Sequence, residues 1–163
     1  MHLSGTPDEM GRQYGEQLRE SIQAFVYERL VAGGAYLSQR GHPPSRFLDS
    51  ARTSIAVFRA WDPRGYEELA ATAEAAGVGA DELFAAGNYT DLRDVAAHRR
   101  PAPDSEGCTA VVVVNCDAAV VCGQTWDLNP SDVAHVVAVH RVPSDGSPET
   151  FGVTVAGCPA LSA

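Results

Sequence analysis

Apolar side chains recur at steps of three and four along the first part of the chain, and this period predicts helices. The first predicted helix covers residues 7–31, with Thr6 as its N-cap, Pro7 at its first position and Glu9 placed to complete a capping box. Gly33-Gly34 is expected to end or loosen this helix. Further helices are expected at 45–60, at 66–76 and from 81 onwards.

Two glycines of the first predicted helix, Gly11 and Gly15, lie four positions apart and so share one face. They either allow another backbone to approach closely or are merely tolerated there. The sequence leaves both interpretations open.

The period changes after a polar connector at residues 99–107, which contains two prolines and no apolar pattern. Four consecutive valines at 111–114 predict a strand that is covered on both faces. Residues 118–124 predict the antiparallel strand that returns from it, so this hairpin is expected at the centre of a sheet. A second antiparallel hairpin is expected from residues 133–142 and 151–155.

Helices followed by antiparallel strands indicate an α+β fold. The chain is expected to divide into a helical segment at residues 1–98, the connector at 99–107 and the start of a β-sheet portion at 108–163. Two of the four strands are strongly apolar and require more cover than the helices provide. We therefore expect this sequence to be incomplete, with a C-terminal portion or a subunit of the same precursor as its partner.

Composition and charge exclude several classes of protein. A hydrophobic content of 45% with 20% charged residues is typical of a folded chain. The net charge of −9 argues against nucleic acid or an anionic membrane as the main partner. No apolar run is long enough to span a membrane and no signal peptide is present, so a cytoplasmic protein is expected. All basic residues are arginine, which excludes lysine-dependent chemistry within this sequence.

The four cysteines and five histidines show no metal-ligand spacing, so neither a metal nor another cofactor is expected. His135 and His140 lie five apart in a strand-like run, which predicts that they occupy opposite faces of a strand. Metal or redox use of Cys116 and Cys122 is an alternative that requires them to lie close together.

Chemistry concentrates at Cys108, where the polar connector meets the valine-rich strand. Attack of its sulfur on the carbonyl of Gly107 would give a thioester, and hydrolysis would then free Cys108 as a new N-terminus. The freed α-amine is a base placed to activate its own thiol. The alternative is a buried structural cysteine at the start of a strand.

The residues Glu106-Gly107-Cys108-Thr109, followed by two strands and then Gly123-Gln124-Thr125-Trp126-Asp127, resemble the processing site and active site of one enzyme family. This family is peptidase C45, the acyl-coenzyme A:6-aminopenicillanic acid acyltransferase-like N-terminal-nucleophile (Ntn) hydrolases. Residues 5–15 and 68–89 are similar to its helical signatures. The resemblance implies a four-layer αββα sandwich, of which this sequence would supply the helical part and the first strands.

The resemblance also implies roles for individual residues. Cys108 corresponds to the nucleophile and Gly107 to the residue before the self-cleaved bond, while Asp127 corresponds to the aspartate that orients the nucleophile's amine. Thr109 matches the threonine beside the nucleophile, and Gln124 falls where related bile-salt hydrolases and penicillin V acylases keep an arginine. Ala110 replaces a second threonine of the penicillin enzyme, so penicillin specificity is not transferred. Without the motif, Asp127 would be interpreted as a turn residue.

The expected function is therefore that of a self-processing cysteine acyltransferase or amidohydrolase that acts on C–N bonds. It would move an acyl group from an amide or thioester, such as an acyl-coenzyme A, to an amine or water. The alternative is a non-catalytic, unprocessed protein of the same fold that acts by binding or as a structural component.

Overall fold

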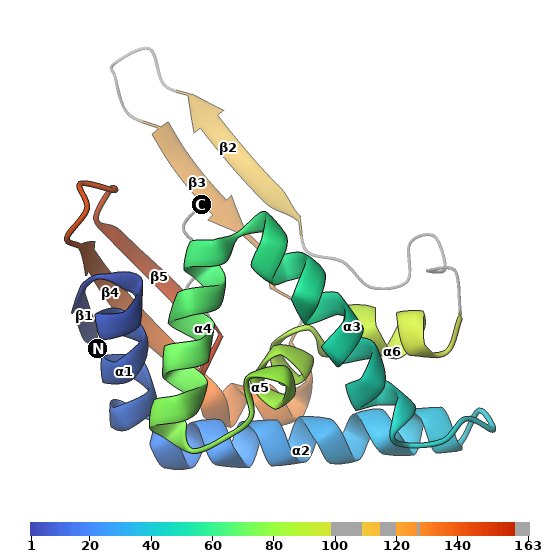
Figure 1. The fold of residues 1–163 in the computed structure, drawn as a ribbon. Helices are drawn as coiled ribbons and strands as arrows, with labels where there is room; N and C mark the ends of the chain where they lie inside the picture. Colours follow the sequence, from blue (N-terminus) through green and yellow to red (C-terminus); the bar gives the residue numbers. More distant parts are fainter. Residues whose placement is uncertain (99–108, 115–119, 127, 159–163) are drawn as a thin grey trace.

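The computed structural model describes residues 1–98, 109–114, 120–126 and 128–158, and the protein is an α+β structure. Helices form one side of the molecule, and a three-stranded sheet and a separate two-stranded hairpin form the other (Figure 1). The helices are α1 (Pro7–Gln17), α2 (Arg19–Ser38), α3 (Arg46–Trp61), α4 (Pro63–Ala76), α5 (Ala80–Gly87) and α6 (Tyr89–Ala96). The strands are β1 (His2–Gly5), β2 (Ala110–Val114), β3 (Val120–Gln124), β4 (Val136–Pro143) and β5 (Thr150–Val155), with the 3₁₀ helix η1 (Pro130–His135) before β4.

The first predicted helix is present as two helices, α1 and α2, which are separated at Leu18. Its start is confirmed, because the Thr6 hydroxyl accepts from the Glu9 N–H and the Glu9 carboxylate accepts from the Thr6 N–H. The predicted end at Gly33-Gly34 is wrong, since α2 continues to Ser38. Gly33 instead makes room for a neighbour, because a Cβ there would lie 2.6 Å from the Phe47 ring.

The close-approach interpretation of Gly11 and Gly15 is confirmed. These glycines face α4, and a Cβ on either would lie 2.4 Å from a backbone carbonyl oxygen, that of Glu68 or of Thr72. The two helices therefore pack with their backbones nearly in contact over this stretch.

The other helices follow local signals. Asp62 caps α4 by accepting from the Gly65 N–H, and Gly77 ends it in the left-handed conformation. Ser45 precedes α3 but makes no capping hydrogen bond with its side chain. Between α2, α3, α5 and α6 lies the main core, whose fully buried members include Ile22, Phe25, Leu37, Phe47 and Leu83.

The second predicted hairpin is confirmed as the antiparallel pair β4–β5. The third strand of this sheet, β1, was not predicted. Strand β1 pairs in parallel with β4, so the order of strands in the sheet is β1-β4-β5. A second core lies between this sheet and α1 and consists of Leu3, Met10, Tyr14 and Val139. The prediction for the two histidines is wrong: His135 ends η1, and only His140 lies in a strand.

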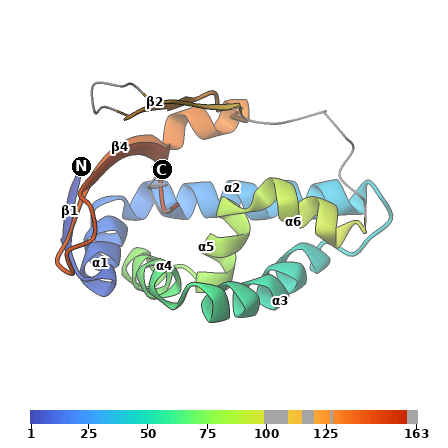
Figure 2. The ribbon, with the colours of Figure 1, turned by 90° about the horizontal axis from the view of Figure 1, so that it is seen from above.

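The first predicted hairpin is confirmed as the antiparallel pair β2–β3, in which Val111 lies opposite Gly123 and Val114 opposite Val120. The expected cover on both faces is absent within the described part of the chain. The pair is a two-stranded sheet that extends away from the helices (Figures 1 and 2). Residues 111–114 are 54–75% exposed. The four valines correctly predicted a strand. Their burial was not predictable in the same way, because it depends on other elements packing against the hairpin.

Candidate functional site

The predicted site lies at the open end of the β2–β3 hairpin. Gly107, Cys108 and Asp127 lie outside the described residues, as does Cys116, whereas Thr109 is described and Gln124 is described as part of β3. The Thr109 N–H donates to the Thr125 hydroxyl and the Thr125 N–H donates to the Thr109 carbonyl, each over 2.9 Å. Thr109 follows the predicted nucleophile, and Thr125 belongs to the motif that contains the predicted aspartate. These two residues are therefore directly hydrogen-bonded to each other.

Gln124 lies opposite Ala110 in the hairpin, one step inside the Thr109–Thr125 pair. Both threonines are exposed, so the open end of the hairpin is accessible in this chain. The structure thus brings together Thr109 and the Gly123-Gln124-Thr125-Trp126 run, which lie more than ten positions apart in sequence.

A small cavity lies where the chain leaves the hairpin and returns to the helices. Its volume is about 200 Å³, and Trp126, Leu128 and Asn129 contribute to its lining. The opposite wall comes from α2 and from the start of α6, including Arg29 and Tyr89. It therefore combines aromatic side chains with several polar and charged groups, and it is smaller and more polar than most small-molecule sites.

The polar centre of this cavity is a buried ion pair between Arg29 on α2 and Asp132 on η1, whose side chains are 10% and 5% exposed. The amide oxygen of Asn129, in the orientation that satisfies the amide, accepts from Arg29 Nη2 at 3.0 Å and from Nη1 at 3.1 Å. The guanidinium carbon lies 4.6 Å from the centre of the Tyr89 ring and 5.5 Å from that of Phe25. Arg29 is therefore held on several sides.

A second contact joins α2 to η1 at Ser21, about two helical turns before Arg29. Ser21 Oγ and His135 Nδ1 lie 3.0 Å apart, and the Glu28 carboxylate lies 3.6 Å from His135 Nε2. The His135 ring also packs against Phe25 at 5.5 Å between centroids. Side chains of α2 thus contact η1 at two of its residues, Asp132 and His135.

Cys158 is the described cysteine nearest to this cavity, and it is not suited to nucleophilic chemistry. Burial of the thiol raises its pKa to about 12, although the nearby Arg29 charge acts in the opposite direction and Asp132 adds to the rise. Its sulfur sits against Gly87, where an added Cβ would lie 3.0 Å from Sγ. The thiol is therefore neutral at physiological pH.

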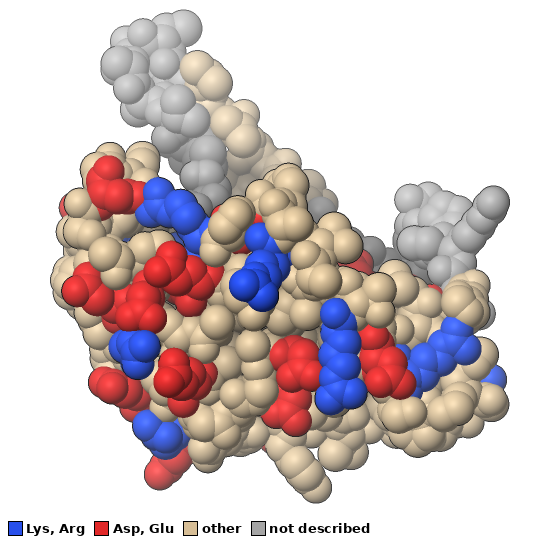
Figure 3. Space-filling view, in the orientation of Figure 1, with Lys and Arg blue, Asp and Glu red and all other residues tan. Residues whose placement is uncertain are grey.

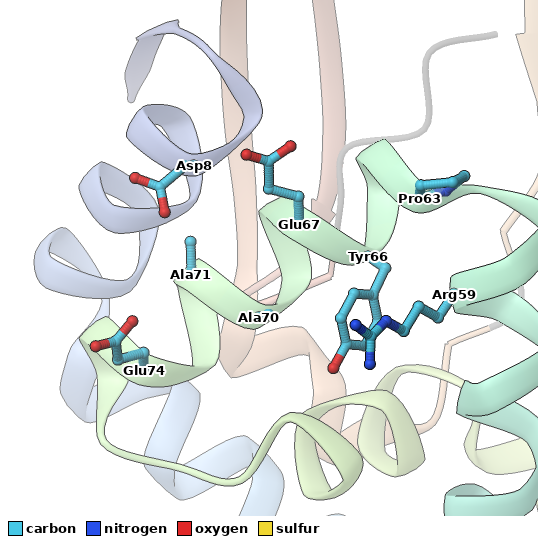
Figure 4. Close-up of a pocket in the computed structure, with 8 residues that line it drawn as sticks. All are labelled: Asp8, Arg59, Pro63, Tyr66, Glu67, Ala70, Ala71 and Glu74. Carbon is cyan, nitrogen blue, oxygen red and sulfur yellow. The ribbon is translucent and has the colours of Figure 1, made fainter.

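A larger groove of about 440 Å³ lies on the opposite side of the helices, between α1, α3 and α4 (Figure 4). Arg59 stacks over the Tyr66 ring at 5.1 Å, and the carboxylates of Asp8, Glu67 and Glu74 surround the remainder. Its described lining contains no cysteine, serine or histidine, and its polar groups are carboxylates, one arginine and one tyrosine.

The face shown in Figure 3 carries arginine and acidic side chains in alternation. Several arginines of the described chain pair with acidic side chains, including Arg12 with Asp8, Arg52 with Asp81 and Arg64 with Asp145. This face therefore presents a mixed charge.

Two negative findings apply to the residues that the structure describes. No three or more His, Cys, Asp or Glu side chains among them are grouped so as to hold a metal ion. None of their helices combines the length and the apolar character that crossing a membrane requires.

Sequence reasoning did not identify the Arg29–Asp132–Asn129 cluster. One signal was present: Arg29 lies four positions after Phe25 and so falls within the apolar stripe of its helix. Asp132 and Asn129 carried no comparable signal, because both occur in a segment that reads as a turn.

No family model and no curated protein matches this chain.

Proposed function

We propose that this chain is the N-terminal part of a self-processing cysteine acyltransferase or amidohydrolase with the αββα fold of the Ntn hydrolases. The observation that carries the proposal is a pair of sequence motifs, Gly107-Cys108-Thr109 and Gly123-Gln124-Thr125-Trp126-Asp127, whose described residues meet at the antiparallel pair β2–β3. The hydrogen bonds between Thr109 and Thr125 support it, since they join the described ends of the two motifs.

The chemistry has two stages. In processing, the Cys108 sulfur attacks the Gly107 carbonyl carbon, the peptide C–N bond breaks, and the nitrogen takes a proton to become the α-amine of Cys108. Water then hydrolyses the thioester and leaves a carboxylate on Gly107.

In turnover, the free α-amine accepts the thiol proton while the sulfur attacks the acyl carbonyl of the donor. The leaving amine or thiol takes up that proton. Water or an acceptor amine then attacks the acyl-enzyme and regenerates the thiol. Asp127 has the role of holding the α-amine, with its carboxylate within hydrogen-bond reach or one water away. Thr109 and Gln124 flank the reacting groups.

Two features of the described structure support a place for the hairpin inside a larger sandwich. The side chains of residues 111–114 are exposed on both faces of β2, which suits a central strand once other layers cover it. The cavity beside Trp126 offers a site for a small acyl donor or acceptor next to the aspartate motif.

The test is intact-mass and N-terminal analysis of purified full-length protein. We expect two chains, one ending at Gly107 and one beginning at Cys108, without an added protease. Cys108→Ala should abolish both the new N-terminus and acyl transfer, whereas Cys108→Ser serves as the matched variant that retains a weaker nucleophile and slow cleavage. Wild-type rates of acyl transfer in Cys108→Ala would contradict the mechanism. An intact Gly107–Cys108 bond together with a thiol that electrophiles do not trap would favour the non-catalytic alternative.

A further inference from the structure

We propose that Arg29 is a positioning residue for the acyl-transfer site, an inference that rests on the proposed function. It acts through the segment that follows Asp127, which it binds from helix α2. Arg29 precedes the proposed cleavage point in sequence and its partners follow it, so after processing this contact would join two separate chains.

The contacts are specific to this segment. Arg29 donates to the Asp132 carboxylate and, through both terminal nitrogens, to the amide oxygen of Asn129 at 3.0 and 3.1 Å. Asn129 lies two residues after Asp127, and Leu128 between them packs against the main core. A displacement of Asn129 is therefore transmitted over a very short length of chain to the predicted catalytic aspartate.

The guanidinium geometry matters as well as its charge. A planar fork is required to reach two acceptors at once, and the guanidinium carbon lies over the rings of both Tyr89 and Phe25. Lysine would keep the positive charge but would lose the second hydrogen bond and the stacking. The pair is buried, and the free energy that two charges lose on leaving water offsets much of the attraction between them.

Arg29 also lines the same cavity as Trp126, so the residue that fixes the segment lies beside the space where a substrate group would bind. A misplacement of about 1 Å in a reacting group reduces turnover by a factor of up to about 100. The inference thus predicts a loss of rate with little change in substrate affinity.

The experiment compares Arg29→Lys with the matched control Arg59→Lys in full-length, processed protein. Arg59 is exposed and also stacks on a tyrosine, but it makes no contact with η1. The probe is p-nitrophenyl acetate: the Cys108 sulfur bonds to the acetyl carbonyl carbon, the bond between that carbon and the phenolic oxygen breaks, and p-nitrophenol leaves with the thiol proton. Water then hydrolyses the acetyl thioester, which releases acetate and restores the thiol. We expect kcat to fall about tenfold or more in Arg29→Lys with KM within about twofold, and no change in Arg59→Lys.

A second pair of measurements separates positioning from folding. Hydrogen exchange of residues 128–135 should accelerate in Arg29→Lys while the thermal midpoint stays close to that of the wild type. The double variant Arg29→Met/Asp132→Leu replaces the ion pair with apolar packing, and we expect it to keep its stability but not its rate. Wild-type kcat in Arg29→Lys, or recovery of kcat together with stability in the double variant, would overturn the inference.

Failure of the proposed function gives a different result. In that case wild-type protein shows no p-nitrophenol release and no acetyl group on Cys108. The positioning role in acyl transfer then falls with the proposed function, and faster exchange at 128–135 in Arg29→Lys shows only that Arg29 holds this segment in place.

Discussion

Glu68 is a carboxylate that lies between α4 and the sheet, where it pairs with Arg141 on β4. Burial raises its pKa above the ordinary value; the Arg141 charge partly opposes this, and the Asp62 charge adds to it. The folded protein therefore binds the Glu68 proton more tightly than the unfolded chain does.

This pKa shift gives a prediction for stability. Since the folded-state pKa is the higher one, the contribution of Glu68 to the free energy of unfolding is most favourable below the unfolded pKa and falls as pH rises through the folded pKa. Glu68→Gln removes this dependence, so the stability of the variant relative to the wild type should rise from acid to neutral pH. Urea unfolding at several pH values measures it, with the exposed neighbour Glu67 as the control in Glu67→Gln. Parallel pH profiles for wild type and Glu68→Gln would contradict the assignment.

At the scale of elements, the contact of α1 with α4 depends on two positions without side chains. A Cβ added to Gly11 or Gly15 would lie 2.4 Å from a backbone carbonyl oxygen of α4. Since these oxygens are part of the hydrogen-bonded backbone of α4, they cannot move away unless the whole helix moves.

We expect Gly11→Ala to lower the free energy of unfolding by about 1–3 kcal/mol, because the new methyl group forces the two helices apart. Urea denaturation followed by circular dichroism measures the change. The matched control is Gly34→Ala on α2, where the nearest atom is the Pro44 Cβ at 3.2 Å and belongs to a loop. The gain in helix propensity should there offset the tighter contact, leaving a change within about 1 kcal/mol. A Gly11→Ala protein as stable as the wild type would show that the helices do not approach this closely.

The same elements show what the sequence could reveal. Signals that act within a few residues, such as the capping box at Thr6 and the left-handed Gly77, were sufficient to locate helix ends. The pairing of β1 was not predictable from local pattern, because its four residues gain a strand partner only through β4. Likewise, the exposure of residues 111–114 depends on which elements lie nearby rather than on their own side chains.

The candidate site divides in the same way. The motifs around Cys108 and Asp127 are readable as sequence, and their approach follows from a hairpin that could be predicted. The Arg29 cluster requires knowing that α2 passes beneath η1, a tertiary relation between residues 103 positions apart. The sequence shows that Arg29 lies within the apolar stripe of its helix, but it does not indicate that Asp132 and Asn129 are the residues that bind it.

At the scale of the whole molecule, three kinds of contact join residues before the connector to residues after it. Strand β1 pairs with β4, Arg29 forms an ion pair with Asp132, and the buried Tyr14 hydroxyl lies 3.1 Å from the Val155 carbonyl oxygen. Each joins the helical segment to the portion after residue 107. These contacts therefore join the two portions independently of the connector.

We accordingly expect a protease site placed within residues 99–107 to be cut without separating the two products. In Cys108→Ala protein, which cannot process itself, the nicked sample should elute from a size-exclusion column as one species and separate only in denaturant. The uncut sample of the same variant is the control. Elution of two species under native conditions would mean that the connector, and not the contacts, holds the portions together.

The parallel pairing of β1 with β4 has a consequence for how the protein folds. His2 and His140 are paired although they are 138 positions apart, so β1 is synthesised long before the strand with which it pairs. The helices make mostly nearer contacts and form early, whereas closing the sheet carries the entropy of a very long loop. Docking of β1, together with Leu3 and its neighbours in the second core, is therefore a late event in folding, and the N-terminal strand remains exposed to competing partners until then.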